Sequence, residues 1–243
     1  MAYLPTASFC GRLRGDFLNM TAEVCGSRFG RGFVRPGGVG FDLDARQVDE
    51  LRTRLLRARR ELTEAVELLW DTPTVVERFE NTGTVTREVA EQIGLVGPAA
   101  RACGILRDVR HDFPSDIYRF VHLPAMTAHY GDVNSRAVVR WLEIQQSIRF
   151  ILDQLEALPA GPTARPAGSL ASDSVAVTLV EGWRGEICHV ALTDEAGRFR
   201  RYKITDPSFH NWFGLALALR DGQISDFPLC NKSFNLSYCG HDL

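Results

Sequence analysis

The spacing of apolar residues changes once along this chain, from a helical repeat to an alternating one. One stripe at steps of three, four or seven residues is formed by Val48, Leu51, Leu55, Leu62, Val66 and Leu69. A second stripe of the same kind is formed by Trp141, Ile144, Ile148, Leu152 and Leu155. Such steps predict two long amphipathic helices, which can pack against each other in an antiparallel bundle.

Residues at the ends of these stripes predict where the helices begin. Asp42 or Asp44 can cap the first long helix, and Asp132 or Asn134 can cap the second. We also expect a short helix from Pro73 to Phe79 and another that begins after Thr86.

Glycines complicate the first thirty residues. The segment from Leu4 to about Phe33 has a helix-compatible pattern, but it is interrupted by Gly11, Gly15, Gly26, Gly30 and Gly32. Because each glycine costs a helix about 1 kcal/mol, this number predicts either close backbone packing or a broken helix. Arg35 to Val39, which contains Pro-Gly-Gly, predicts a turn.

The alternating pattern begins after a segment rich in proline, glycine and alanine, residues 159–173. Val175 to Leu179, Ile187 to Thr193 and Phe199 to Ile204 predict a small antiparallel sheet, and a helix is expected from Phe209 to Leu219. The predicted fold is mainly α, a helical bundle with a small antiparallel β-sheet near the C-terminus (α+β). Residues 1–158 form the bundle, 159–173 a linker, and 174–243 the sheet with a helix and tail that pack back on the bundle.

Composition and motif searches exclude several classes of protein. A net charge of −2 gives no electrostatic case for binding nucleic acid. No apolar run reaches the length of a membrane span, and the first residues do not form a secretory signal. None of the six cysteines forms C-x-x-C, and the nucleophile, phosphate-loop, dinucleotide and H-E-x-x-H motifs are absent. The six scattered histidines are interpreted as structural.

Six segments resemble, in the same order, motifs of one oxidoreductase family. They are Cys25 to Val39, Gly94 to Ile105 (T-G-P-x-A-R-A-S-G), Arg107 to Pro114 (D-x-R-x-x-x-P), Gly131 to Arg136 (G-D-x-x-x-R), Glu181 to Glu186 (E-x-P-R-G-E) and Tyr202 to Phe209 (Y-R-x-K-I-x-x-P-S-F). The family is that of the large subunit of membrane-bound (group 4) nickel–iron hydrogenases and the related 49-kDa or D subunit of respiratory complex I. The resemblance spans essentially the whole chain.

The resemblance implies a partner, a cofactor and a location. In the family this region faces a small subunit that carries a [4Fe-4S] cluster, in a complex with antiporter-like membrane subunits. It therefore implies a peripheral subunit on the cytoplasmic side of the membrane, with quinone binding and NAD binding among the expectations for such a complex. The candidates for the cluster-facing surface are Arg28, Arg110, Glu181, Arg184 and Glu186. Equally, these charges can be core ion pairs that hold the bundle to the sheet.

The chain departs from the hydrogenase pattern at the metal ligands. A nickel–iron centre needs four thiolates, two from an N-terminal C-x-x-C and two from a C-terminal D-P-C-x-x-C. The N-terminal pair is not found, and Asn235, Leu236 and Ser237 occupy the D-P-C positions, with Cys239 the only thiol nearby. We therefore expect no cofactor held by this chain and the [4Fe-4S] cluster in the partner.

The complex I branch also differs from this sequence. The family's quinone-binding histidine and tyrosine lie in an N-terminal region that is not recognised in this sequence. Gly30 occupies the position where the complex I branch has a histidine in the first motif. The chain is shorter than its relatives, so we expect half of a split subunit, a truncated product or a fragment. Three functions stay open: an oxidoreductase subunit beside the cluster that helps form the cavity where electrons leave, a non-catalytic interface subunit, or half of a split nickel–iron hydrogenase.

Overall fold

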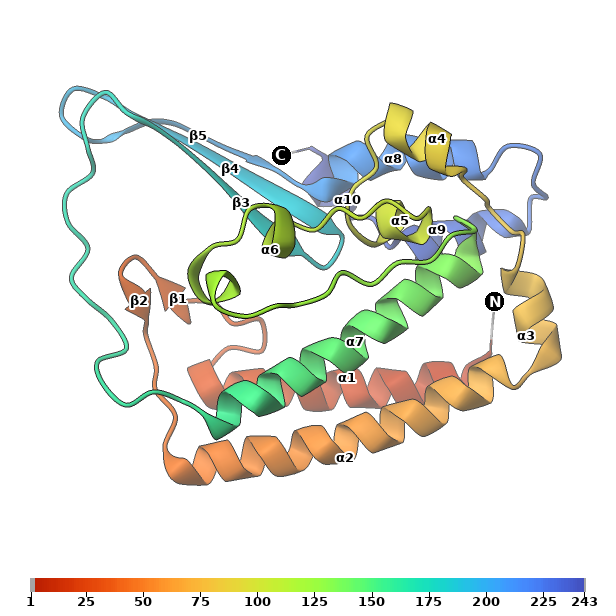
Figure 1. Ribbon diagram of the computed structural model, residues 1–243, viewed down its shortest axis with the longest axis horizontal. Helices are drawn as coiled ribbons and strands as arrows, with labels where there is room; N and C mark the ends of the chain where they lie inside the picture. Colours follow the sequence, from red (N-terminus) through yellow and green to blue (C-terminus); the bar gives the residue numbers. More distant parts are fainter. Residues whose placement is uncertain (1–2, 243) are drawn as a thin grey trace. The chain divides into compact units, whose positions relative to one another are not determined.

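The structure is a computed structural model that describes residues 3–242 and divides them into two compact units. Residues 3–75 and 144–169 form the helix unit, and residues 76–143 and 170–242 form the sheet unit. The sheet unit draws on both sides of the predicted linker at 159–173, whereas the helix unit ends within it, and the division into separate domains stays a prediction. Figure 1 shows the order of the helices and strands along the chain.

Two long antiparallel helices build the helix unit, α1 (Leu4–Cys25) and α2 (Ala45–Trp70). They are joined near one end by a hydrogen bond from Thr6 Oγ1 to the carbonyl of Ala65, 2.9 Å, and further along by an ion pair between Arg12 and Glu61. Asp44 caps α2 in a reciprocal capping box with Gln47, so the first stripe and one of its two predicted caps are confirmed.

The expectation of a broken or closely packed helix in the segment from Leu4 to Phe33 is wrong at Gly11 and Gly15, although the helix does break at Gly26. Gly11 and Gly15 lie inside the continuous helix α1, and a Cβ at either position would meet nothing within 4 Å. The packing of α1 on α2 outweighs the small intrinsic penalty of the two glycines. Gly26 ends the helix in the left-handed conformation, with a φ of 72°.

The rest of the helix unit follows the predicted order. The turn at Pro36 and Gly37 joins β1 (Val34–Arg35) to β2 (Gly38–Val39). The second half of α7 (Val133–Glu156) runs antiparallel to α2, and Gln145 lies 3.3 Å from Arg59. Asp132 caps α7 by accepting the N–H of Ser135 at 2.7 Å. The two long antiparallel helices predicted from the stripes are therefore present.

Short helices and one sheet build the sheet unit. The helices are α3 (Pro73–Phe79, shared with the helix unit), α4 (Arg87–Gln92), α5 (Gly97–Ala102), α6 (Val109–Asp112), the 3-10 turn η1 (Asp116–Arg119), the first half of α7, α8 (Pro207–Ala218), α9 (Asp226–Phe234) and α10 (Tyr238–His241). The strands are β3 (Val175–Gly182), β4 (Gly185–Thr193) and β5 (Phe199–Thr205), antiparallel with β4 in the middle. The predicted α+β fold is confirmed.

The hydrophobic core of the sheet unit joins α4 and α5 to the C-terminal helices. Its most buried members include Leu95, Ala100, Cys230 and Phe234, which come from segments more than a hundred residues apart. The helices α9 and α10 were not expected, since the last stretch has no clear apolar period. Among the residues that the structure covers, no helix combines the length and apolar character needed to cross a bilayer.

Candidate functional site

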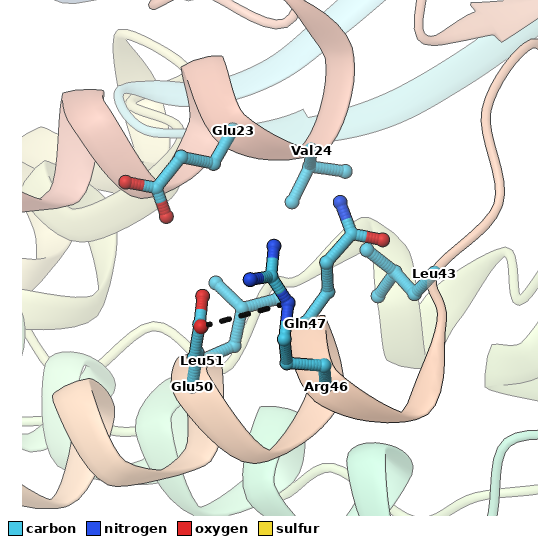
Figure 2. Close-up of a pocket in the computed structure, with 7 residues that line it drawn as sticks. All are labelled: Glu23, Val24, Leu43, Arg46, Gln47, Glu50 and Leu51. Carbon is cyan, nitrogen blue, oxygen red and sulfur yellow. Dashed lines mark ion pairs between the residues drawn. The ribbon is translucent and has the colours of Figure 1, made fainter.

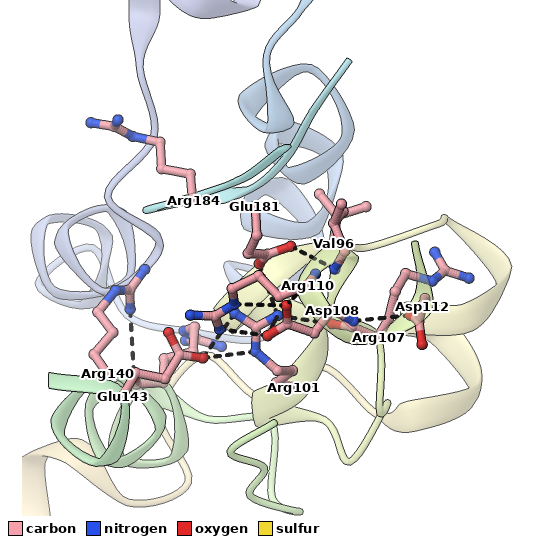
Figure 3. Close-up of polar contacts among 12 residues, drawn as sticks. Val96, Arg101, Arg107, Asp108, Arg110, Asp112, Arg140, Glu143, Glu181 and Arg184 are labelled. Atoms are coloured by element: carbon pink, nitrogen blue, oxygen red, sulfur yellow. Dashed lines mark hydrogen bonds and ion pairs between the residues drawn. The ribbon is translucent and has the colours of Figure 1, made fainter. Parts of the chain in front are cut away.

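A buried arginine is the centre of a network of ion pairs in the sheet unit. Arg101 lies in α5, where Pro98 occupies the first turn and alanines flank the arginine in sequence, and its exposure is 0%. Figure 3 shows carboxylates converging on it from three elements. Arg101 lies 2.8 Å from Glu143 of α7, 2.9 Å from Glu181 of β3 and 3.5 Å from Asp108 before α6.

The hairpin between β3 and β4 is attached to this network at two points. The carboxylate of Glu181 accepts a hydrogen bond from Nη1 of Arg101 and another from the backbone N–H of Val109, the latter at 3.2 Å. Gly97 and Gly185 approach so closely that a Cβ on Gly97 would lie 2.3 Å from the Cα of Gly185. The N-terminus of α5 therefore packs directly on the hairpin, which fixes the two-residue loop Trp183-Arg184.

Asp108 and Arg110 form a second layer of the same network. Arg110 donates to both carboxylate oxygens of Asp108, at 2.9 and 2.5 Å. Burial of Asp108 opposes ionisation, but the hydrogen bond from Arg110 and the charge of Arg101 outweigh it, so its pKa is lowered. Burial acts against the charge of Arg110 too, yet its bond to Asp108 leaves the pKa raised.

Glu181 behaves in the opposite way to Asp108. Burial raises its pKa, and the charge of Asp108 adds to that effect, while Arg101 offsets only part of it. The physical reason is that Arg101 is shared among three carboxylates, so Glu181 is not fully compensated. The network can therefore take up a proton at Glu181 more readily than at Asp108.

Four of the five predicted site residues come together at the hairpin and α6. Arg110 and Glu181 belong to the Arg101 network, and Arg184 occupies the hairpin loop. Glu186 stands opposite Glu181 in the register of β3 and β4 and is half-buried. Arg28 belongs to the helix unit, where it is exposed in a turn after α1.

Sequence reasoning missed Arg101, Asp108 and Glu143 as members of this network. One signal could have identified Arg101, because it is the single charge in the otherwise small and apolar run Ala99 to Cys103. Such a charge is buried only if it is paired. Its partners could not be read from spacing, since Glu143 lies on another helix.

The last turn of α9 is held by arginines. Arg140 donates to the carbonyl oxygens of Ser233 and Phe234, at 2.5 and 3.0 Å, and Arg184 Nε donates to that of Asn235. Arg136 Nε donates to the hydroxyl of Ser233 at 2.8 Å. Burial lowers the pKa of Arg136 and that of Arg140 to about 10, so both stay charged at neutral pH. Cations are favourable at a helix C-terminus, and this clamp fixes the segment that follows.

That segment contains the positions of the family's C-terminal metal ligands. Ser237 occupies the first cysteine position, and its hydroxyl accepts the N–H of Gly240 at 2.9 Å and so caps α10. Gly240 follows three residues later, at the second cysteine position. A Cβ there would lie 2.5 Å from Cγ of Asp206, so the space for a second ligand side chain is taken by a carboxylate.

These residues do not fit a nickel–iron centre. The only thiol of the segment is Cys239, which is exposed and lies between the two ligand positions. Within residues 3–242, no group of three or more histidine, cysteine, aspartate or glutamate side chains is arranged to hold a metal ion. We therefore assign no metal chemistry to this end of the chain.

A pocket of about 330 Å³ in the helix unit is a weaker candidate. Figure 2 shows it between the end of α1 and the start of α2. Of its charged side chains, Arg46 pairs with Glu50 at 3.8 Å and Glu23 pairs with Arg54. Because these are surface ion pairs, the pocket presents no buried, unpaired charge to a ligand.

Comparison with protein families places the chain among known proteins. Residues 4–174 match the family described as respiratory-chain NADH dehydrogenase, 49 Kd subunit. The chain belongs to this family. The 49 Kd subunit family was expected from the six motifs, and the match covers the first four of them, which lie before residue 174.

Individual relatives of this 49 Kd family member include hydrogenase and NADH-quinone oxidoreductase subunits. The chain is 34% identical over 214 residues to the carbon monoxide-induced hydrogenase of Rhodospirillum rubrum, with 87% of this chain and 59% of the relative covered. It is 29% identical to formate hydrogenlyase subunit 5 of Escherichia coli, covering 93% and 40%, and 29% identical to NADH-quinone oxidoreductase subunit 4 of Thermus thermophilus, covering 88% and 59%. The chain thus spans 40 to 59% of the length of these three relatives.

The fold has a solved counterpart. A chain of the membrane-bound sulfane sulfur reductase, an archaeal respiratory membrane complex, superposes with a TM-score of 0.89 at 22% identity, covering 97% of this chain and 66% of that one. At this identity the likeness establishes the fold alone.

Proposed function

We propose that the chain is a peripheral subunit of a membrane-associated, complex I-like or hydrogenase-related oxidoreductase. It packs against a small subunit that carries a [4Fe-4S] cluster and helps form the cavity where electrons leave that cluster. The chain itself holds no redox cofactor. Its partners include antiporter-like membrane subunits, and it lies on the cytoplasmic side of the membrane. The acceptor is a quinone or another oxidant, and any NAD binding belongs to the complex rather than to this chain.

The observation that carries the proposal is the buried support of the hairpin loop Trp183-Arg184. Arg101 donates a hydrogen bond to Glu181, and Gly97 packs against Gly185. The side chain of Asn211 donates to the carbonyl of Arg184 at 3.2 Å. A loop held this firmly can present charges at a constant distance from a partner's cluster. Charge and hydrogen bonding around a cluster tune its reduction potential, so the arrangement suits that role.

The test is the potential of the partner's cluster in the purified, assembled complex. Glu186→Gln removes one negative charge next to the loop of the hairpin while it keeps the shape of the side chain. Because a nearby negative charge disfavours the reduced cluster, the variant is expected to raise the midpoint potential, measured by a redox titration with electron paramagnetic resonance detection. Electron transfer to a quinone analogue is measured on the same samples.

Glu195→Gln is the matched control. Glu195 is exposed in the turn between β4 and β5, at the far end of β4 from the hairpin. Its replacement is expected to leave both the potential and the rate as in the wild type. An intact complex in which Glu186→Gln has no effect either would favour a non-catalytic interface subunit.

The split-hydrogenase alternative meets a specific obstacle. It requires two thiolates from the C-terminal segment, where Ser237 and Gly240 stand and Asp206 fills the adjacent space. Another chain would have to supply all four thiolates. The observations therefore favour a role beside the partner's cofactor.

A further inference from the structure

The two edges of the three-stranded sheet are built differently. β5, at one edge, carries the exposed cations Arg200, Arg201 and Lys203, and its pairing with β4 is interrupted by a register shift at Leu192 and Thr193. Charged side chains and bulges are the usual means by which a sheet edge avoids pairing with another chain. The β5 edge is therefore protected.

The β3 edge lacks this protection. Val175 to Val180, with the sequence V-A-V-T-L-V, contains no charge and no proline, and its pairing with β4 runs without a shift. Val175 is 66% exposed, Val177 60% and Val180 54%. A flat, apolar and uncharged edge strand is a template for strand addition.

The backbone groups at this edge are oriented outward. The two-residue loop makes Gly182 and Gly185 the closing hydrogen-bonded pair, and the carbonyl of Ser174 accepts the N–H of Thr193 at 2.9 Å. Because bonded positions alternate along an antiparallel strand, the N–H and C=O groups of Val175, Val177 and Leu179 point away from β4. No described strand pairs with β3 on that side.

The free edge has defined ends. At Glu181 it is covered by α6, which lies beside β3 in Figure 1 and whose Val109 N–H bonds to the Glu181 side chain. At the other end, the carbonyl of Ala171 accepts the hydroxyl of Thr193, which turns the preceding segment toward β4. Six residues, Val175 to Val180, are left open, which is about the length of an ordinary strand.

We propose that the β3 edge binds an extended segment of another subunit as a fourth strand. Outward N–H and C=O groups at every second residue can form backbone hydrogen bonds with an added β-strand, but not with a helix. The exposed side chains of Val175 and Val177 lie on one face and that of Val180 on the other. The incoming segment therefore carries uncharged, apolar residues on both faces. This inference rests on the proposed function, because the strand is taken to come from another subunit of the complex.

Hydrogen exchange with mass spectrometry tests the proposal. The amides of Val175, Val177 and Leu179 are compared in the purified chain alone and in the purified complex. They are expected to exchange at least about tenfold more slowly in the complex, while the outward amide of Tyr202 on the protected edge is unchanged. Assembly without slower exchange at β3 would overturn the inference and leave the proposed function standing.

A proline at each edge gives the matched variants. Val177→Pro removes an outward N–H without breaking a bond to β4, and Tyr202→Pro does the same on the opposite edge. Only Val177→Pro is expected to lower recovery of the chain in the complex, by roughly tenfold. Equal recovery of the two variants would contradict the inference. Protection of β3 in a dimer of this chain would also overturn the inference. A chain that joins no other subunit would overturn both the inference and the proposed function.

Discussion

At Arg101, one buried guanidinium is shared among carboxylates from three separate segments of the chain. Taking one partner out of such a group leaves uncompensated charge in the interior, which is far more damaging than losing a surface pair. Arg101 thus holds the β3–β4 hairpin in position through its ion pair with Glu181. It also stabilises α6 through its ion pair with Asp108, the residue that caps this helix.

Replacing Arg101 by methionine is expected to destabilise the chain by roughly 3–5 kcal/mol, because Glu181 and Glu143 lose their cation inside the protein. Urea unfolding of the purified chain measures the effect. Arg87→Ala is the control, since the ion pair of Arg87 with Glu91 is exposed to solvent, and it should change the free energy of unfolding by less than about 1 kcal/mol. Similar losses in the two variants would show that Arg101 does not hold the network together.

The two perturbed carboxylates predict pH effects of opposite sign. The raised pKa of Glu181 means that the folded state binds its proton more tightly than the unfolded chain does, where the pKa is about 4.3. Its contribution to stability is therefore present at acidic pH and lost as the pH rises through the folded value. The lowered pKa of Asp108 stabilises the fold above about pH 3.9, and this contribution is lost on acidification.

Urea unfolding between pH 3 and 7 separates the two effects. As the pH falls from 7, the wild type should gain stability relative to Glu181→Gln. Below about pH 3.9 it should lose stability relative to Asp108→Asn. Parallel pH curves for the wild type and Glu181→Gln would contradict the raised pKa of Glu181.

At the scale of elements, helices with local signals were predictable and helices held by distant residues were not. Pro73 and Thr86 mark the starts of α3 and α4, and the alternating valines mark β3. Gly11 and Gly15 do not break α1, because a cost of about 1 kcal/mol each is outweighed by packing on α2. The helix α9 was missed because it ends on carbonyls bound by Arg140 and Arg184, which no local pattern records.

The contact of α5 with the β3–β4 hairpin can be tested with glycine substitutions. Gly97→Ala is expected to destabilise the chain by at least about 2 kcal/mol, because φ is 64° and the new Cβ would overlap the backbone of Gly185 and Arg184. Gly94→Ala has a similar φ but open space, so about 1 kcal/mol of strain is expected. Gly11→Ala, inside α1, should stabilise by about 1 kcal/mol. Thermal unfolding ranks the three, and a Gly97 variant no worse than Gly94→Ala would contradict the close contact.

For the whole molecule, the motif order identified the family, but the geometry of the site came only from the fold. Arg110, Glu181 and Arg184 were found because they stand in motifs, whereas Glu143 reaches Arg101 only when α7 and α5 are packed. The loss of C-terminal thiolates was readable in the sequence. The sequence does not show that Asp206 fills the space at Gly240, because the two positions meet only through the packing of α10 on α8.

The most direct test of the central claim is the metal content of the purified, assembled complex, measured as nickel and iron per copy of this chain. Because the C-terminal segment offers serine and glycine where two thiolates are needed, we predict iron from the partner's cluster and no stoichiometric nickel. One nickel ion per copy of the chain would contradict the claim that it acts only beside a neighbour's cofactor.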